Sequence, residues 1–151
     1  MSFDTPNGTR GARQPGKWTS LPNKLMTKRI RKSGQAMNTD ALVLTTIGRR
    51  TGTARETPVA CFPGGEFSWF IVASAAGAPR NPAWYYNLAA HPDEVQVETA
   101  GRKVAVTAEQ LHGRARDAAW QQITASSPRF AQYQQKTDRE LPVIRLTPRE
   151  T

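Results

Sequence analysis

This sequence of 151 residues contains little cysteine, no long apolar run and few acidic residues in its first third. Cys61 is the single cysteine, which excludes an internal disulfide and fits a reducing compartment. No segment approaches the roughly 18 apolar residues that a transmembrane helix needs, and the first residues lack the apolar core of a signal peptide. These absences predict a cytoplasmic protein with one free thiol, and the apolar run around Cys61 favours a buried thiol over a nucleophile.

Several kinds of catalytic site are also missing. The two histidines, His91 and His112, lie far apart in the sequence and neither belongs to a His-x-x-x-His or Cys-x-x-Cys pattern, so we predict no metal site. No nucleophile elbow is present, and no Gly-x-Gly-x-x-Gly follows a strand-like run. The acidic residues are scattered and offer no glycosidase-type pair. The sequence patterns alone therefore identify no catalytic residue in this chain.

Positive charge is concentrated at the N-terminal end. The formal net charge is +9, and residues 1–50 carry ten Lys and Arg against two Asp and Glu, whereas residues 51–151 carry eleven against ten. The excess is thus a feature of one segment rather than of the whole chain. Because aromatic residues are not interleaved with this basic segment, nucleic acid is the weakest candidate partner.

Three regions follow from composition. Residues 1–20, rich in Gly, Pro, Thr and Arg, predict a flexible or lightly docked tail, and residues 36–151 predict one domain. Between them, residues 21–35 predict a basic amphipathic helix with Leu25, Met26 and Ile30 on one face. With Trp18 as an interfacial anchor, residues 18–32 could lie on an anionic membrane surface, which would make the protein peripheral on the inner face of the cell membrane. The alternative is that the apolar face packs on the domain.

The domain is predicted to be mainly β. Strands are predicted at residues 41–46, 57–62, 67–73, 94–99, 103–110 and 141–146, with a turn at Ala100-Gly101. Helices are predicted at residues 82–90, 114–125 and 128–136, the first and last opened by Asn81-Pro82 and Ser127-Pro128 as N-cap and first-turn pairs. The expected fold class is therefore α+β, with six mostly antiparallel strands and three or four flanking helices.

The stretch Gly48-Arg-Arg-Thr-Gly-Thr-Ala-Arg55 joins the first two predicted strands. Its two glycines allow a tight turn, and its three arginines offer planar forks that suit phosphate or carboxylate groups. Successive backbone N–H groups in such a turn can also bind an anion. Two interpretations remain open at this point: a phosphate site at a hairpin tip, or a solvated basic turn.

Three blocks in order resemble a known family: Leu44–Pro58, the run Val-Ala-Ser-Ala-Ala-Gly at 72–77, and Asn-Pro-Ala-Trp-Tyr-Tyr-Asn-Leu at 81–88. A closing segment, residues 133–142, adds to the likeness, which covers about residues 41–148. The sequence resembles the deazaflavin-dependent nitroreductases, split β-barrel reductases that use coenzyme F-420. The resemblance implies that fold and that cofactor, with FMN as the weaker alternative.

The resemblance also implies roles for individual residues. The glycine-arginine turn would hold the phosphate and acidic tail of the cofactor, the backbone at 58–60 would border its ring, and the loop at 74–77 would lie along the ring and ribityl chain. The residues so implied in cofactor binding are Arg49, Arg50, Thr51, Gly52, Arg55, Pro58, Val59, Ala60, Ser74, Ala75, Ala76, Gly77, Asn81, Trp84 and Tyr85. Phe130 and Tyr133 would border the substrate, with Tyr133 either a hydrogen-bond or proton donor or a packing residue.

The chemistry implied is hydride transfer from C5 of the reduced deazaflavin to a quinone, an activated enone or a nitroarene. Three departures from the family pattern narrow the range of expected substrates. Ala75 stands where some relatives have lysine, Ala60 where some have tyrosine, and Ser127 and Phe130 replace tyrosines of relatives that reduce nitroimidazole prodrugs. These departures favour a general reductase over a prodrug reductase. A non-catalytic carrier of deazaflavin, FMN or haem is the second hypothesis, and a monomer or homodimer fits either.

Overall fold

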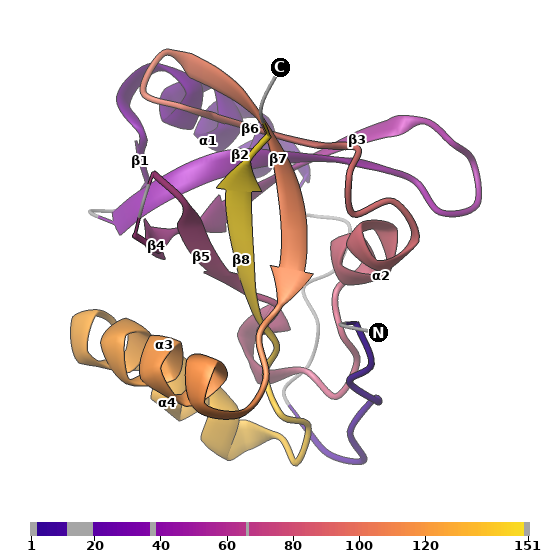
Figure 1. The fold of residues 1–151 in the computed structure, drawn as a ribbon, viewed down its shortest axis with the longest axis vertical. Coiled ribbons are helices and arrows are strands. Elements are labelled where there is room, and N and C mark those ends of the chain that lie inside the picture. The colour runs from indigo at the N-terminus through magenta and orange to yellow at the C-terminus, as the bar shows by residue number, and fades with distance from the viewer. Residues whose placement is uncertain (1–2, 12–19, 37–38, 66, 150–151) are drawn as a thin grey trace.

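An antiparallel sheet that curls into a split barrel forms the centre of the molecule (Figure 1). The computed structural model describes residues 3–11, 20–36, 39–65 and 67–149. In this part of the chain the strands are β1 (Gln35–Ala36), β2 (Thr39–Ile47), β3 (Ala54–Ala60), β4 (Phe62–Pro63), β5 (Trp69–Val72), β6 (Val95–Thr99), β7 (Arg102–Gln110) and β8 (Val143–Pro148). They pair in the order β1-β2-β6-β7-β8-β5-β4, and β3 pairs with β2 alone. The mainly β, antiparallel fold predicted from the sequence is confirmed, and its six strands correspond to the six that exceed two residues.

Four α-helices and one short 3-10 turn surround the sheet. They are α1 (Ser20–Ser33), η2 (Ala75–Gly77), α2 (Ala83–Ala90), α3 (Gly113–Ser126) and α4 (Arg129–Lys136). In Figure 1, α3 and α4 lie together below the barrel and α2 lies beside it. Within the described residues, no helix is long and apolar enough to cross a membrane.

Alternating apolar side chains of the sheet fill the barrel. Leu42 and Leu44 of β2 are fully buried and pack with Ile144 and Leu146 of β8. Helix α2 closes this core from one side, because its Leu88 is also fully buried within the same cluster. A period-2 apolar pattern on the strands thus becomes one continuous core.

A second apolar cluster fixes α3 and α4 beneath the sheet. Phe130 of α4 meets Phe62 edge-to-face, with ring centroids 5.6 Å apart, and Ile123 of α3 is buried in the same cluster. Tyr133 borders this cluster and meets the Phe130 ring edge-to-face at 5.6 Å. Aromatic contacts of α4 and the buried Ile123 of α3 therefore hold the two helices against the barrel.

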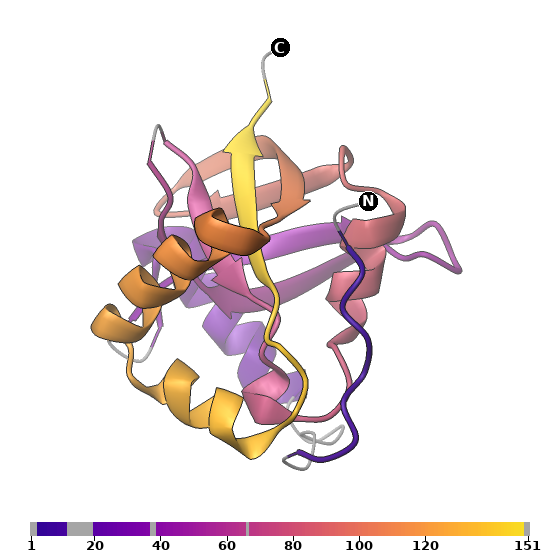
Figure 2. The ribbon, with the colours of Figure 1, turned by 60° about the horizontal axis from the view of Figure 1, so that its bottom comes forward.

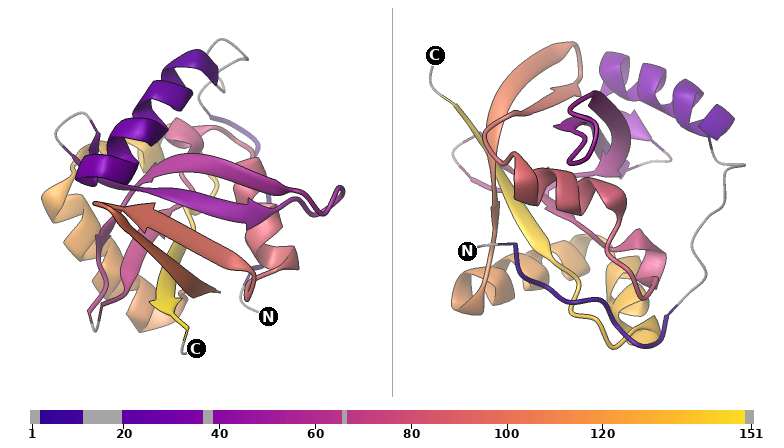
Figure 3. Two further views of the ribbon diagram at one scale, coloured as in Figure 1. Left: turned by 90° about the horizontal axis from the view of Figure 1, so that it is seen from above. Right: turned by 90° about the vertical axis from the view of Figure 1, so that its right-hand side faces the viewer.

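Helix α1 packs across the outside of the sheet (Figure 3, left). Its Ile30 is fully buried against Ala41 and Val43, and Met26 is partly buried beside them. Arg31 forms ion pairs with Glu56 of β3 and, at 3.3 Å, with Glu98 of β6. Leu25, expected on the same apolar face, is instead 75% exposed, so the packing alternative holds for only part of that face.

Residues 3–11 dock on the domain as a strap (Figures 2 and 3). The Thr5 N–H donates to the Tyr85 hydroxyl at 3.1 Å, and the Gly8 N–H donates to the Pro79 carbonyl at 2.7 Å. At the far end, Asp138 accepts hydrogen bonds from the N–H groups of Thr9 (2.7 Å) and Arg10 (3.2 Å). For residues 3–11 the docked alternative describes the tail, whereas residues 12–19, including Trp18, lie outside the described part.

Two predicted helix starts are wrong by one residue. Helix α2 begins at Ala83 with Pro82 as its N-cap, and the Asn81 side chain makes no cap hydrogen bond. Helix α4 begins at Arg129 after Pro128, and Ser127 instead caps the C-terminus of α3 through its N–H to the Ile123 carbonyl. Asn81 is engaged instead with Thr5 and Arg139, which are distant in sequence, and Ser127 is engaged with the preceding helix.

Strand ends were also misplaced around two turns. The second strand starts at Ala54 rather than residue 57, because the register with β2 continues to the pair Ile47 and Ala54. The third starts at Trp69 rather than residue 67, because Phe67 has φ 66° in a turn closed by the Ser68 N–H and the Gly65 carbonyl. The turn at Ala100-Gly101 is confirmed, with φ of 51° and 78°, as a tight hairpin of right-twisted strands requires.

Candidate functional site

The arginine-rich stretch forms the tip of the hairpin between β2 and β3, which projects beyond α2 in Figure 1. The Gly48 N–H donates to the Thr53 carbonyl and the Gly52 N–H to the Gly48 carbonyl, both at 2.8 Å. Gly52 has φ 71°, and nothing lies within 4 Å of the place where its Cβ would be. The tip is therefore an open, backbone-exposing turn, as the sequence predicted.

Helix α2 fixes the base of this hairpin. The Asn87 amide accepts a hydrogen bond from the Arg49 N–H at 3.0 Å and donates to the Thr46 hydroxyl at 3.2 Å. The Arg49 guanidinium also lies over the Tyr86 ring, 4.7 Å from its centroid, which is a cation–π contact. Asn87 is 8% exposed, and its role was missed in the sequence, although a buried amide on an apolar helix face is a signal for such a tie.

The charges of Arg50 and Arg55, the other two arginines of the hairpin, are not neutralised by an ion pair among the described residues. Glu56 stands next to Arg55 but is already bound to Arg31. The hairpin thus carries an excess of positive charge, which favours an anion.

Strand β3 has one free edge among the described residues, where β2 is its only partner in the sheet. The Cys61 N–H donates to the Asp40 carbonyl at 3.0 Å. Backbone groups alternate along an antiparallel pair, so with Ala60 aligned to Ala41 the polar groups of Pro58 and Ala60 face outward. Pro58 has no N–H, which fits this outward position.

A cleft of about 1070 Å³ lies between the hairpin, α2 and α1. Of the residues predicted from the sequence, Arg49, Arg50, Thr51, Arg55, Pro58 and Trp84 line it. The cleft is also lined by Gly48 and Ala54 of the predicted turn, and by residues to which the sequence gave no role: Thr27, Glu56, Thr57, Ala83 and Asn87. A space of this size holds a cofactor-sized ligand.

A second group of predicted residues gathers at the other end of β3. The loop at 74–77 packs on α4, where a Cβ on Gly77 would lie 2.7 Å from the Tyr133 carbonyl oxygen. Ala60 and Tyr133 border the same apolar cluster under the sheet. Five residue steps separate Arg55 from Ala60, or about 17 Å along a strand, so the two groups suit an elongated ligand rather than a compact one.

Two of the predicted residues have side chains engaged within the protein. The Tyr85 hydroxyl donates to the Gln110 side chain at 2.6 Å, and burial raises its pKa. The Asn81 amide donates to the Thr5 carbonyl at 3.0 Å and accepts from Arg139 at 2.6 Å. Neither lines the cleft, and Val59 and Gly52 do not line it either.

Fold and site together define a class: a split barrel with a free strand edge and an arginine-bearing hairpin, an arrangement that suits an elongated anionic ligand. The family model described as F420H(2)-dependent quinone reductase matches residues 22–148. The chain belongs to that family, whose members are oxidoreductases that use coenzyme F-420. The recognition, the enzyme class and the cofactor inferred from the sequence are confirmed.

Individual relatives agree with this assignment. An F420H(2)-dependent quinone reductase of Mycobacterium tuberculosis is 37% identical over 112 residues, covering 72% of this chain and 74% of the relative. A solved F420-H2 dependent reductase, FDR-A, has 33% identity and a TM-score of 0.64, covering 70% of this chain and 92% of the other. The haem storage protein HutZ of Vibrio cholerae has a TM-score of 0.54 at 16% identity, over 82% of this chain and 88% of its own. The last likeness concerns the fold alone.

Proposed function

We propose that the chain holds reduced coenzyme F-420 along the free edge of β3 and directs its hydride to a quinone, an activated enone or a nitroarene. The observation that carries this proposal is the cleft of about 1070 Å³, which joins unpaired arginines to an open strand edge. When bound, the deazaflavin supplies the hydride at C5. The chain then has to bind, orient and exclude water, which needs no protein nucleophile.

The residues of the site fit such a group. Arg50 and Arg55 would hold its phosphate and acidic tail, and Arg49, fixed over the Tyr86 ring, would line the same end. The outward backbone of Pro58 and Ala60 would border the ring system, next to the loop at 74–77. Trp84 lines the cleft from α2 and would help to exclude water.

Tyr133 is the candidate donor to the substrate. Among the described residues its hydroxyl has no hydrogen-bond partner, while its ring contacts Phe130 and lies 5.8 Å from the Lys136 ammonium group. The backbone of Tyr133 lies against the loop at 74–77, and a hydroxyl without an internal partner can donate a hydrogen bond to an acceptor oxygen or supply a proton. We propose that role for Tyr133, with Phe130 as the apolar wall beside it.

The decisive experiment is acceptor-dependent oxidation of the reduced cofactor. Purified protein is mixed with reduced deazaflavin, and its absorbance is followed before and after addition of a small quinone, an enone or a nitroarene. The proposal expects oxidation that depends on both protein and acceptor, and a Tyr133→Phe variant with lower kcat and preserved cofactor affinity. Binding without oxidation by any acceptor would instead establish the carrier alternative, and equilibrium binding of deazaflavin, FMN and NADPH side by side tests the choice of cofactor.

We also propose that α1 contacts an anionic membrane surface. Leu25 is 75% exposed beside the exposed basic residues Lys28 and Arg29 of the same helix, an arrangement typical of interfacial helices. Such contact would bring the cleft near lipid-soluble quinones. Co-pelleting with anionic vesicles is expected to exceed that with neutral vesicles and to fall for Leu25→Asp; equal absence from both vesicles would remove the idea.

A homodimer is the oligomeric state that we propose. One solved relative, 28% identical with a TM-score of 0.65 and covering 86% of this chain and 93% of its own, is titled a domain-swapped dimer. Sedimentation equilibrium distinguishes the alternatives, because a monomer has a mass of 16.7 kDa and a homodimer twice that value.

A further inference from the structure

A buried arginine is hydrogen-bonded to the loop at 73–78, which is the loop at 74–77 with one further residue on each side. Arg139, between α4 and β8, is 2% exposed, and its guanidinium donates five hydrogen bonds to that loop and its continuation. The Nε atom donates to the Ala78 carbonyl (3.2 Å), Nη1 to the Ala73 carbonyl (2.9 Å) and the Asn81 side-chain oxygen (2.6 Å), and Nη2 to the carbonyls of Ser74 (2.8 Å) and Ala78 (3.0 Å). A guanidinium has five N–H donors, so every one is used on this single loop.

The loop that it holds has a backbone conformation of high energy. Ala75, Ala76 and Gly77 have φ of 46°, 55° and 84°, three left-handed residues in succession. The left-handed conformation costs about 1–2 kcal/mol for each residue with a Cβ. Such strain persists where the surroundings fix it, and it is concentrated at functional sites.

The Arg139 guanidinium, called the clamp below, binds the loop on both sides of its left-handed residues. The carbonyls of Ala73 and Ser74 precede them and that of Ala78 follows them, so the planar guanidinium sets the separation of the two ends. Lysine, with one rotatable ammonium group, cannot span these acceptors. Helix α4 also holds the loop, because it leaves no room for a Cβ on Gly77.

We propose that Arg139 is a positioning residue, whose guanidinium holds the loop at 73–78 in the conformation that accepts the deazaflavin ring. The proposal rests on the proposed function, because the role of this loop is inferred from the family resemblance. Arg139 itself lies behind the loop and acts through the loop backbone.

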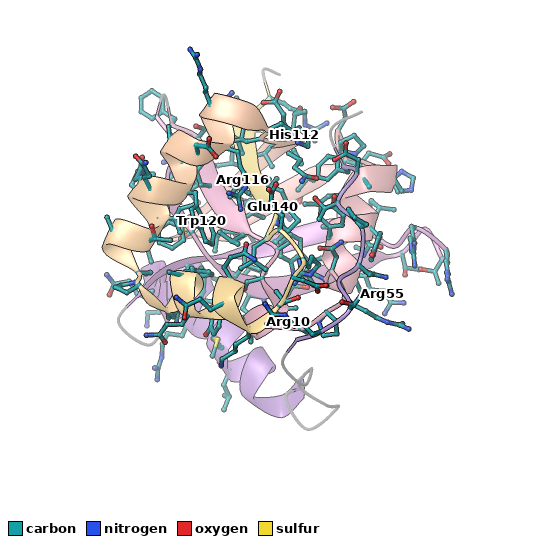
Figure 4. The ribbon with its side chains drawn as sticks, turned by 90° about the horizontal axis from the view of Figure 1, so that it is seen from below. Arg10, Arg55, His112, Arg116, Trp120 and Glu140 are labelled. Atoms are coloured by element: carbon teal, nitrogen blue, oxygen red, sulfur yellow. The ribbon has the colours of Figure 1, made fainter. Side chains whose placement is uncertain are left out.

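The chain offers a matched control in Arg116. It is also buried, at 9% exposed, and donates to the Leu141 carbonyl at 2.9 Å, but no hydrogen bond joins it to the loop. Figure 4 shows Arg116 beside Trp120 of its own helix and near Glu140; its guanidinium lies 4.9 Å from the Trp120 ring centroid. Changing either arginine to lysine removes one buried guanidinium, and only one of the two changes reaches the loop.

Hydrogen exchange of the protein without cofactor tests the clamp itself. In Arg139→Lys, the amides of residues 75–81 should exchange at least about tenfold faster than in wild type, because the loop opens locally. Arg116→Lys should leave their exchange unchanged. Unchanged exchange in Arg139→Lys, or an equal increase in both variants, would overturn the proposal.

Cofactor binding then tests what the clamp is for. Arg139→Lys should raise both the Kd and the KM for the deazaflavin at least about tenfold with the KM for the quinone unchanged, whereas Arg116→Lys should alter neither. Faster exchange with unchanged deazaflavin affinity would overturn the positioning role. If wild-type protein binds no deazaflavin, the proposed function fails, and the exchange experiment still decides whether Arg139 holds the loop.

A milder variant keeps the proposal testable if Arg139→Lys does not fold. Asn81→Ala removes one of the acceptors and leaves the guanidinium and its carbonyl partners in place. It should increase loop exchange and the deazaflavin Kd by smaller factors than Arg139→Lys. An Asn81→Ala protein with wild-type exchange and wild-type affinity would overturn the proposal.

Discussion

At the scale of single residues, the arginines fall into two groups: those bonded within the protein and those whose charge is open to a ligand. Arg31, Arg116 and Arg139 are engaged with carboxylates or carbonyls of the protein, whereas Arg50 and Arg55 have no ion-pair partner among the described residues. Sequence composition cannot make this distinction, because it depends on which acceptors the fold brings near each guanidinium. The pair on the hairpin is the part of the charge that a ligand can use.

Removing that pair should weaken the binding of the anionic cofactor. For Arg50→Gln combined with Arg55→Gln, we expect a loss of about 2–4 kcal/mol in deazaflavin binding, from two charge-assisted contacts. Fluorescence titration at low and high salt measures it, and the wild-type affinity should be the more salt-dependent. Arg114→Gln, an exposed arginine of α3 outside the cleft, is the control; an equal loss in that variant would count against a specific tail site.

Cys61 should be inert in the folded protein. Burial, and secondly the charge of Asp40, raises the pKa of its thiol to about 12, so the reactive thiolate is rare at pH 8. We expect a thiol reagent to react at least about 100-fold more slowly with folded than with urea-unfolded chain. Because the folded pKa is raised, the associated stability is present below the unfolded pKa and is lost as pH rises toward 12. Rapid labelling of folded protein at pH 8 would contradict this placement.

At the scale of elements, the backbone of η2 meets the backbone of α4 without side chains between them. Gly77 makes this contact possible and also adopts φ 84°. The sequence pattern Ser-Ala-Ala-Gly marked this loop as small-residue, but the need for glycine arises from α4, more than fifty residues later. Packing between distant elements, rather than local propensity, fixes this position.

Replacing Gly77 by alanine should cost more than the same change at Gly52. Both glycines have positive φ, at 84° and 71°, but a Cβ on Gly77 would lie 2.7 Å from the Tyr133 carbonyl oxygen, whereas nothing lies within 4 Å of one on Gly52. We expect about 1 kcal/mol for Gly52→Ala and about 2–4 kcal/mol for Gly77→Ala, since the clash adds to the strain. Urea unfolding measures both, and equal costs would show that α4 yields at this contact.

At the scale of the whole molecule, the first residues of the chain meet its last elements. The strap at 3–11 crosses from Tyr85 to Asp138 and links α2, the loop at 73–81 and the segment before β8. The strap therefore restrains the side of the barrel that carries the loop, which no local pattern in a Gly- and Pro-rich segment could reveal.

Acid should release the far end of this strap. Hydrogen bonds from the Thr9 hydroxyl and the N–H groups of Thr9 and Arg10 lower the pKa of Asp138 to about 2. Since the folded pKa is lowered, the attachment is complete above the ordinary carboxyl pKa near 4 and is lost as pH falls through about 2. The Thr9 amide chemical shift should titrate with that midpoint in wild type and not in Asp138→Asn. A midpoint near 4 would show that the strap is not held in solution.

The sequence predicted the parts of the fold that short-range rules govern. The turn that begins at Gly48, the Ala100-Gly101 turn and the alternating valines of β6 and β7 each depend on neighbours within a few residues. Each was placed correctly except for the end of the first turn, where Ala54 and Arg55 already belong to β3. The predicted cap at Asn81 failed because Arg139, 58 residues away, takes its side-chain oxygen. About half of the residues that line the cleft were predicted, because the arginines lie in one turn of the sequence. Thr27 and Asn87 were not predicted, because they come from helices that reach the cleft only in the folded barrel.

The bare edge of β3 has a consequence beyond ligand binding. A strip of unpaired peptide groups, open as the proposed cofactor site requires, is also a template on which a second chain could add a strand and begin to aggregate. Pro58 sits in the middle of that strip and offers no N–H to an incoming chain. The proline that would border the cofactor ring would therefore also limit fibre growth on the edge when no cofactor covers it.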